Sequence, residues 1–104
     1  MAKYVFIYKG GQMAETQAER DAQFAAWGQW FGKLGSAVAD GGNPFGDSKS
    51  VRPGGSVADG APSDLGGYSV IKADSLAAAT ELAKGCPILA NKGSVEVYET
   101  IDVM

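Results

Sequence analysis

The chain has 104 residues, 45% of them hydrophobic, and a formal net charge of -3. This size fits one domain covering residues 1–104, and the acidic balance argues against a nucleic-acid partner, which normally requires a basic face. The absence of histidine and the presence of a single cysteine exclude a His-activated nucleophile, a His-ligated metal and an internal disulfide, so we predict neither a bound metal nor a cofactor.

The sequence also predicts where the protein resides. No apolar stretch approaches the length needed to span a bilayer, so we expect no membrane contact. The apolar run from Tyr4 to Tyr8 is too short for a secretion signal and is typical of a strand. Because Cys86 has no second cysteine to pair with, a reducing compartment is the natural expectation. We therefore expect a cytoplasmic protein.

The first third of the chain predicts a strand followed by a long helix. Residues 3–8 are β-branched and aromatic, and they carry apolar side chains on both faces, which is typical of an inner strand. Thr16 and Glu19 fit a Thr-x-x-Glu capping box that begins a helix, and Gly35 is the expected stop. Apolar residues at intervals of three and four give this helix one buried face: Phe24, Trp27, Phe31 and Leu34.

Residues 36–67 are rich in Gly, Pro, Ser, Asp and Asn and predict a long irregular segment. Within it, residues 51–53 and 56–59 predict either a hairpin or one extended strand with a break. Pro53 makes this element an edge strand or a bulged one, because proline cannot donate to a central ladder. A polar loop of this length in a small domain favours a functional role or a contact with a partner.

The last third predicts a strand, a second helix and a final strand. Residues 66–72 form the strand, Asp74 and Ser75 can cap the helix, and Gly85 ends it. Residues 94–103 alternate between apolar and polar side chains, which is typical of a half-buried strand. Its apolar side is formed by Val95, Val97, Ile101 and Val103.

These elements follow the order βαββαβ, which is the ferredoxin-like α+β arrangement with helices on one face of an antiparallel sheet. The strands nevertheless carry apolar residues on both faces, so the helix-free face needs a cover. A second copy packed sheet to sheet is the usual solution, and we predict a homodimer.

Four short motifs are spread along the chain: an Asp-Gly step at 59–60, Leu-Gly-Gly-Tyr at 65–68, Cys-Pro at 86–87 and Gly-Ser-Val-Glu-Val at 93–97. These motifs resemble those of the YCII-related proteins, in particular their DGPF-type branch, and their order and spacing match over nearly the whole chain. The resemblance implies a dimeric α+β barrel of two ferredoxin-like units, with a cleft between the sheet and the long loop.

The resemblance also implies chemistry, but this chain departs from it. Some of those proteins act on small lactone-type or chlorinated ring-cleavage compounds. A His-Asp pair has been proposed as their catalytic acid and base. Here the Asp-Gly-Pro-Phe motif becomes Asp59-Gly60-Ala61-Pro62, and Cys-Pro-His becomes Cys86-Pro87-Ile88. A His-dependent mechanism cannot be carried over. Asp59 alone is carried over, as a pocket carboxylate.

Each candidate site residue has a structural alternative. Asp59 is the candidate catalytic acid or base, yet Asp-Gly is also a common turn pair. Tyr68 is a candidate ligand contact because the two preceding glycines let a ligand approach the backbone, or it packs in the core or an interface as strand tyrosines usually do. Arg52 could clamp an anion or simply be solvated on an edge strand. Tyr8 and Trp27 could line an apolar pocket or pack in the core.

Three functions remain open from the sequence. We expect a dimeric protein that binds a small organic molecule in a cleft. The first alternative is a cofactor-independent lyase, isomerase or dehydrohalogenase-like enzyme that uses Asp59 on a lactone or small organic acid. The second is a dimerisation or interaction domain without a ligand. The fold cannot choose among them, because ferredoxin-like folds host many unrelated activities. Cys86 is rejected as a nucleophile because it follows a helix C-terminus, whose dipole disfavours a thiolate.

Overall fold

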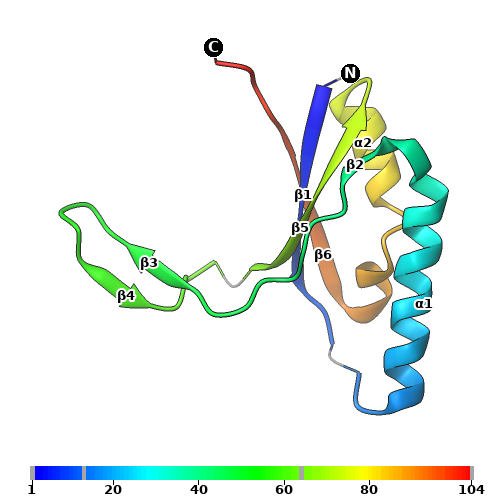
Figure 1. Cartoon of the computed structure of the whole chain (residues 1–104), viewed down its shortest axis with the longest axis horizontal. Helices are drawn as coiled ribbons and strands as arrows, with labels where there is room; N and C mark the ends of the chain where they lie inside the picture. The colour runs from blue at the N-terminus through cyan, green and yellow to red at the C-terminus, as the bar shows by residue number, and fades with distance from the viewer. Residues whose placement is uncertain (1, 13, 64, 104) are drawn as a thin grey trace.

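The centre of the molecule is a four-stranded antiparallel sheet, as a computed structural model of residues 2–12, 14–63 and 65–103 describes it. Its strands are β1 (Ala2–Gly10), β2 (Val38–Asp40), β5 (Leu65–Ala73) and β6 (Gly93–Glu99). The strand order is β2-β5-β1-β6, so β1 is an inner strand, as the sequence predicts (Figure 1). This order is that of the ferredoxin-like α+β fold, and the predicted fold class is confirmed.

Two helices cover one face of the sheet: α1 (Gln17–Leu34) and α2 (Leu76–Ala83) (Figure 1). The predicted caps are present. The Thr16 hydroxyl accepts the backbone N–H of Glu19 at 3.1 Å, and the Ser75 hydroxyl accepts that of Ala78 at 3.0 Å. Gly35 follows α1 with a φ of 54°, a conformation that glycine adopts without strain. Both helices therefore begin where the sequence predicts.

The hydrophobic core fills the space between the helices and the sheet. Every second side chain of β1 faces the helices, and Tyr4, Phe6 and Tyr8 are buried there. Trp30 of α1 stacks on Phe6 with ring centroids 6.2 Å apart. Its indole N–H donates to the backbone carbonyl of Leu82 at 3.1 Å, so its polar atom is satisfied. This tryptophan therefore ties both helices to the central strand.

Two short 3-10 helices connect the main elements: η1 (Gly35–Ala37) and η2 (Pro87–Asn91). Cys86, just before η2, is 3% exposed and packs as the small hydrophobe that the sequence predicts. Lys92, just after η2, has a left-handed φ of 67°. The backbone reverses there, and β6 begins at the next residue.

The segment predicted at 51–59 forms a separate hairpin, and it is not a strand of the main sheet. β3 (Lys49–Val51) and β4 (Val57–Asp59) pair only with each other. The hairpin projects from the helix-free side of the sheet as an arm (Figure 1). Gly54 and Gly55 have φ values of 91° and 92°, which make its tight tip. The strand beside β5 is the shorter β2, which the sequence analysis missed.

Two further expectations about burial were wrong. The final strand ends at Glu99, and Ile101 and Val103 are 75% and 86% exposed. Tyr4 pairs with Glu99, so Ile101 would lie opposite Ala2, the first residue of β1. Residues beyond Ile101 therefore have no partner on β1.

Phe24 is 84% exposed, although the helical periodicity places it on the buried face. The buried residues of α1, Trp30 and Leu34, lie in its C-terminal half. The N-terminal half extends past the end of the sheet (Figure 1), so periodicity correctly identifies the face but not how far the sheet covers it.

Candidate functional site

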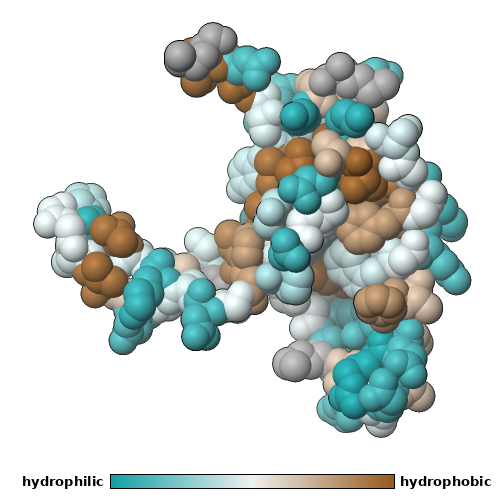
Figure 2. All heavy atoms as spheres, in the orientation of Figure 1, coloured by the Kyte–Doolittle hydropathy of each residue, from teal (hydrophilic) through white to brown (hydrophobic). Residues whose placement is uncertain are grey.

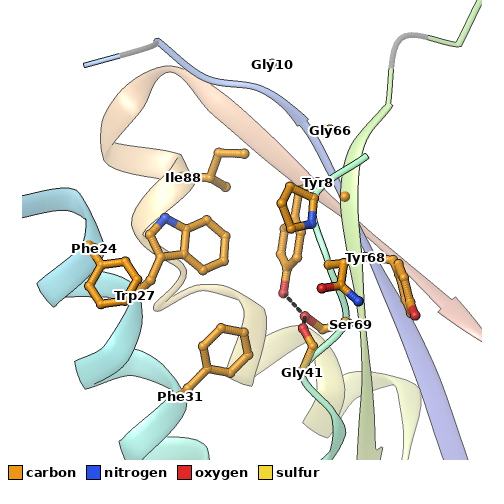
Figure 3. A pocket seen from close by; sticks show the side chains of 14 residues that line it. Tyr8, Gly10, Phe24, Trp27, Phe31, Gly41, Gly66, Tyr68, Ser69 and Ile88 are labelled. Carbon is orange, nitrogen blue, oxygen red and sulfur yellow. Dashed lines mark hydrogen bonds between the residues drawn. The ribbon is translucent and has the colours of Figure 1, made fainter. Parts of the chain in front are cut away.

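A cavity of about 460 Å³ lies between α1 and the sheet, and residues 41–44 form a further wall (Figure 3). Most of its lining is apolar. Three aromatic side chains of α1 and two residues from the opposite walls supply that lining: Phe24, Trp27, Phe31, Tyr8 and Ile88.

Glycines allow residues 41–45 to lie directly on β5. The backbone N–H of Phe45 donates to the carbonyl of Gly66 at 2.9 Å, and Pro44 forms a bridge with Gly67. Gly42 approaches β5 so closely that a Cβ there would overlap the carbonyl oxygen of Tyr68. Gly67 admits this segment as well, because a Cβ there would lie only 3.0 Å from the carbonyl oxygen of Asn43. The result is a cavity wall held by backbone hydrogen bonds.

Three of the aromatic rings that line the cavity, those of Tyr8, Trp27 and Phe31, are packed against one another. Tyr8 and Trp27 meet edge to face, with centroids 5.0 Å apart and an interplanar angle of 88°. The ring centroids of Phe31 and Trp27 are 6.0 Å apart. Such contacts limit the movement of the rings. The cavity therefore has an apolar wall whose shape is largely set before any ligand arrives.

One polar group lies at the buried end of this cavity. The Tyr8 hydroxyl donates to the Ser69 hydroxyl at 2.8 Å, and the Ser69 hydroxyl donates to the carbonyl of Gly41 at 2.7 Å (Figure 3). Ser69 is fully buried. Ser69 was not among the residues predicted from the sequence. The available signal was a lone hydroxyl between Gly67 and Ile71 on the helix-facing side of β5.

Burial favours the neutral forms of two ionisable groups, Tyr8 and Cys86. It raises the pKa of Tyr8 to about 12, although the hydrogen bond with Ser69 acts in the opposite direction. Burial likewise raises the pKa of Cys86 to about 11, opposed by a backbone hydrogen bond from Ile88. The Cys86 thiol therefore keeps its proton at neutral pH, in agreement with its rejection as a nucleophile.

The free energy of unfolding is expected to fall as the pH rises from about 9 to about 11. The folded pKa of Cys86 lies above its ordinary value of 9.0, so the folded state holds this proton more tightly. The stabilisation is complete below pH 9 and is lost through pH 11, at about 1.4 kcal/mol per pH unit. Urea unfolding of wild type and Cys86→Ala between pH 8 and 10 measures this slope. An equally steep fall in the variant would contradict the assignment to Cys86.

The structure brings two of the predicted ligand-binding residues into the cavity, Tyr8 and Trp27. Tyr68 borders it through its backbone only. Because Tyr68 precedes the helix-facing Ser69, its ring lies on the opposite face of the sheet, as Figure 3 shows. There it stacks on Phe45 with centroids 5.8 Å apart. The Tyr68 hydroxyl therefore does not point into the cavity of its own chain.

The other two predicted site residues lie in the hairpin. Asp59 accepts a hydrogen bond from Lys49 at 2.8 Å, and its side chain is 95% exposed. Arg52 is exposed beside the tip, where its backbone N–H donates to Ser56 at 2.8 Å. The structure does not bring either residue to the cavity within one chain. Asp64, a weaker candidate with the same Asp-turn ambiguity, lies outside the described residues.

The part of the chain that the structure describes has neither a metal-binding cluster nor a membrane-spanning helix. No three acidic or cysteine side chains there gather closely enough to hold a metal ion. None of the helices described is long and apolar enough to cross a membrane.

These features define a small α+β protein with a ferredoxin-like sheet and an aromatic-lined cavity between its long helix and that sheet. The chain belongs to the YCII-related domain family, whose sequence profile matches residues 1–104. No curated protein matches it.

Proposed function

We propose that this YCII-related protein binds a small aromatic molecule in the cavity between α1 and the sheet. The observation that carries the proposal is the aromatic wall of Phe24, Trp27 and Phe31 facing one buried polar group at Tyr8. A volume of about 460 Å³ with an apolar lining and few polar groups is typical of small-molecule sites. Phe24, which is 84% exposed, stands where a ligand would cover it.

The lining favours binding over acid-base catalysis. None of the described residues that line the cavity carries a formal charge. The enzyme alternative needs a general acid or base at the ligand, and Asp59 lies in the hairpin instead. That alternative would require Asp59 to reach the cavity from a second molecule. We therefore propose binding as the primary function.

Replacing Phe24 by alanine is expected to weaken the binding of aromatic ligands about threefold to tenfold, because it removes one stacking contact. The unliganded protein should keep its melting temperature, since the side chain is already 84% exposed. A thermal-shift titration with indole measures both quantities. Phe45→Ala is the matched control, because Phe45 stacks on Tyr68, whose ring lies on the opposite face. Equal affinities for indole in wild type and Phe24→Ala would refute the site.

We further propose that the protein is a homodimer formed through the helix-free face of the sheet. The half-buried side chains of Val5, Ile7 and Val70 lie there, because they alternate with the buried residues of β1 and β5. The hairpin also carries paired apolar residues, Val51 and Val57, that are 71% and 59% exposed (Figure 2). A two-stranded hairpin is only marginally stable alone in water. A second copy would cover both surfaces.

Light scattering at micromolar concentration is expected to give twice the 10.7 kDa mass of one chain. Val70→Lys should shift this mass toward that of the monomer, because it places a charge in the middle of the helix-free face. Ala25→Lys, on the exposed side of α1, is the control and should leave the mass unchanged. A wild-type mass of one chain would rule out the dimer.

A further inference from the structure

From the direction of the hydrogen-bond chain at the cavity, we infer the chemical class of the ligand: a neutral aromatic molecule that donates one hydrogen bond to the oxygen of Tyr8. The inference rests on the proposed binding function and narrows it. It follows from three residues, Tyr8, Ser69 and Gly41, and from the limited number of hydrogens that they share.

The backbone carbonyl of Gly41 fixes the direction of the chain. A carbonyl oxygen can only accept, so the 2.7 Å contact with Ser69 uses the single hydrogen of the serine hydroxyl. The 2.8 Å contact between Ser69 and Tyr8 must then use the hydrogen of the tyrosine hydroxyl. Both hydroxyl hydrogens are committed inside the protein. The oxygen of Tyr8 has only lone pairs left, and a ligand can meet it only as a donor.

The positions of the two hydroxyls make Tyr8 the group that a ligand reaches. Ser69 is fully enclosed, whereas Tyr8 remains 7% exposed and borders the cavity. The indole nitrogen of Trp27 lies on the Ile88 side of its ring, away from the Tyr8 hydroxyl (Figure 3). Asn43 is exposed and borders the open part of the cavity. The buried end of the cavity therefore offers an acceptor.

The same arrangement disfavours anions. A carboxylate placed at the buried end would lose its hydration and face an oxygen that can only accept. Among the described lining residues no lysine or arginine offsets that cost. Burial also holds the pKa of Tyr8 near 12, so the phenol is neutral at physiological pH and has no negative charge to attract a cation. A neutral ligand with an N–H or O–H group fits these conditions.

The experiment compares three ligands of nearly the same shape at pH 7 by calorimetric titration. Indole has an N–H donor, benzofuran has a ring oxygen in its place, and indole-2-carboxylate adds a charge. Wild type is expected to bind indole about tenfold more tightly than benzofuran, the effect of one neutral hydrogen bond. The carboxylate should bind more weakly than both.

Two variants test the direction of the chain. Tyr8→Phe removes the acceptor and keeps the bond from Ser69 to Gly41, so indole and benzofuran should bind equally. Ser69→Ala frees the hydroxyl hydrogen of Tyr8 for a ligand. The ratio of the affinities for indole and benzofuran should therefore decrease, and the affinity for indole-2-carboxylate should increase. If benzofuran or the carboxylate binds wild type as tightly as indole, and Phe24→Ala still weakens that binding, the donor inference fails while the proposed function stands. If none of the three ligands binds, both fail.

Discussion

Replacing Phe6 by alanine is expected to lower the free energy of unfolding by about 3–5 kcal/mol. Phe6 is fully buried on the inner strand β1 and stacks on Trp30, which contacts both helices. The shorter side chain would leave a cavity at the point where the sheet and the helices meet. Such a loss is a large part of the roughly 5–15 kcal/mol that stabilises a domain of this size. Urea unfolding monitored by tryptophan fluorescence measures it.

Two further variants keep this test informative. Phe6→Leu retains most of the side-chain volume and should lose clearly less stability, which gives a folded protein even where Phe6→Ala is too unstable to purify. Phe24→Ala deletes the same atoms from a position that is 84% exposed and should change stability by no more than about 0.5 kcal/mol. Equal losses at residues 6 and 24 would contradict the placement of the core.

Replacing Gly42 by alanine is expected to lower the free energy of unfolding by about 3 kcal/mol, for two reasons. Gly42 has a φ of 73°, which an L side chain adopts only with strain. A Cβ there would also overlap the carbonyl oxygen of Tyr68 and lie 2.6 Å from its carbonyl carbon. Because that contact is with backbone, a side-chain rotation cannot relieve it. The segment 41–45 would have to move away from β5.

Gly41→Ala is the matched control for this substitution. A Cβ on Gly41 meets no atom within 4 Å, and its φ is not in the left-handed region. Its effect on stability should stay within about 0.5 kcal/mol. Gly42→Ala should also weaken ligand binding, because residues 41–44 form a wall of the cavity. A Gly42→Ala protein as stable as wild type would show that this segment does not lie on β5.

The parts of the fold that local chemistry determines were predictable. The capping box at Thr16 begins α1, Gly35 ends it, and Ser75 begins α2. The long strands β1 and β5 follow from their β-branched and aromatic residues. In each case the signal lies within a few residues of the feature, so no knowledge of distant contacts is needed.

The parts that depend on distant pairing were not predictable. β2 has only three residues and no alternation to recognise, and it exists because β5 offers it an edge. The sequence of residues 51–59 contains a hairpin, but nothing in it shows that the hairpin stands apart from the main sheet.

The candidate site was predictable only in part, for a similar reason. Tyr8 and Trp27 were identified from apolar patterns, and both line the cavity. The orientation of Tyr68 depends on the pleat of β5, and apolar residues at both Val70 and Ile71 conceal which face is buried. Ser69 was missed because its role depends on Gly41, 28 residues away, whose carbonyl accepts its hydrogen.

The neighbouring positions of β1 and β6 have a consequence for the newborn chain on the ribosome. β6 begins at Gly93, whereas the strand it pairs with ends at Gly10. At a synthesis rate of about 5–20 residues per second, roughly 4–17 s pass between the synthesis of β1 and that of β6. During that time the unpaired edge of β1 can bind other strands. The sheet is therefore completed only seconds after β1 is made, and the nascent chain should be a substrate for chaperones that shield strand edges.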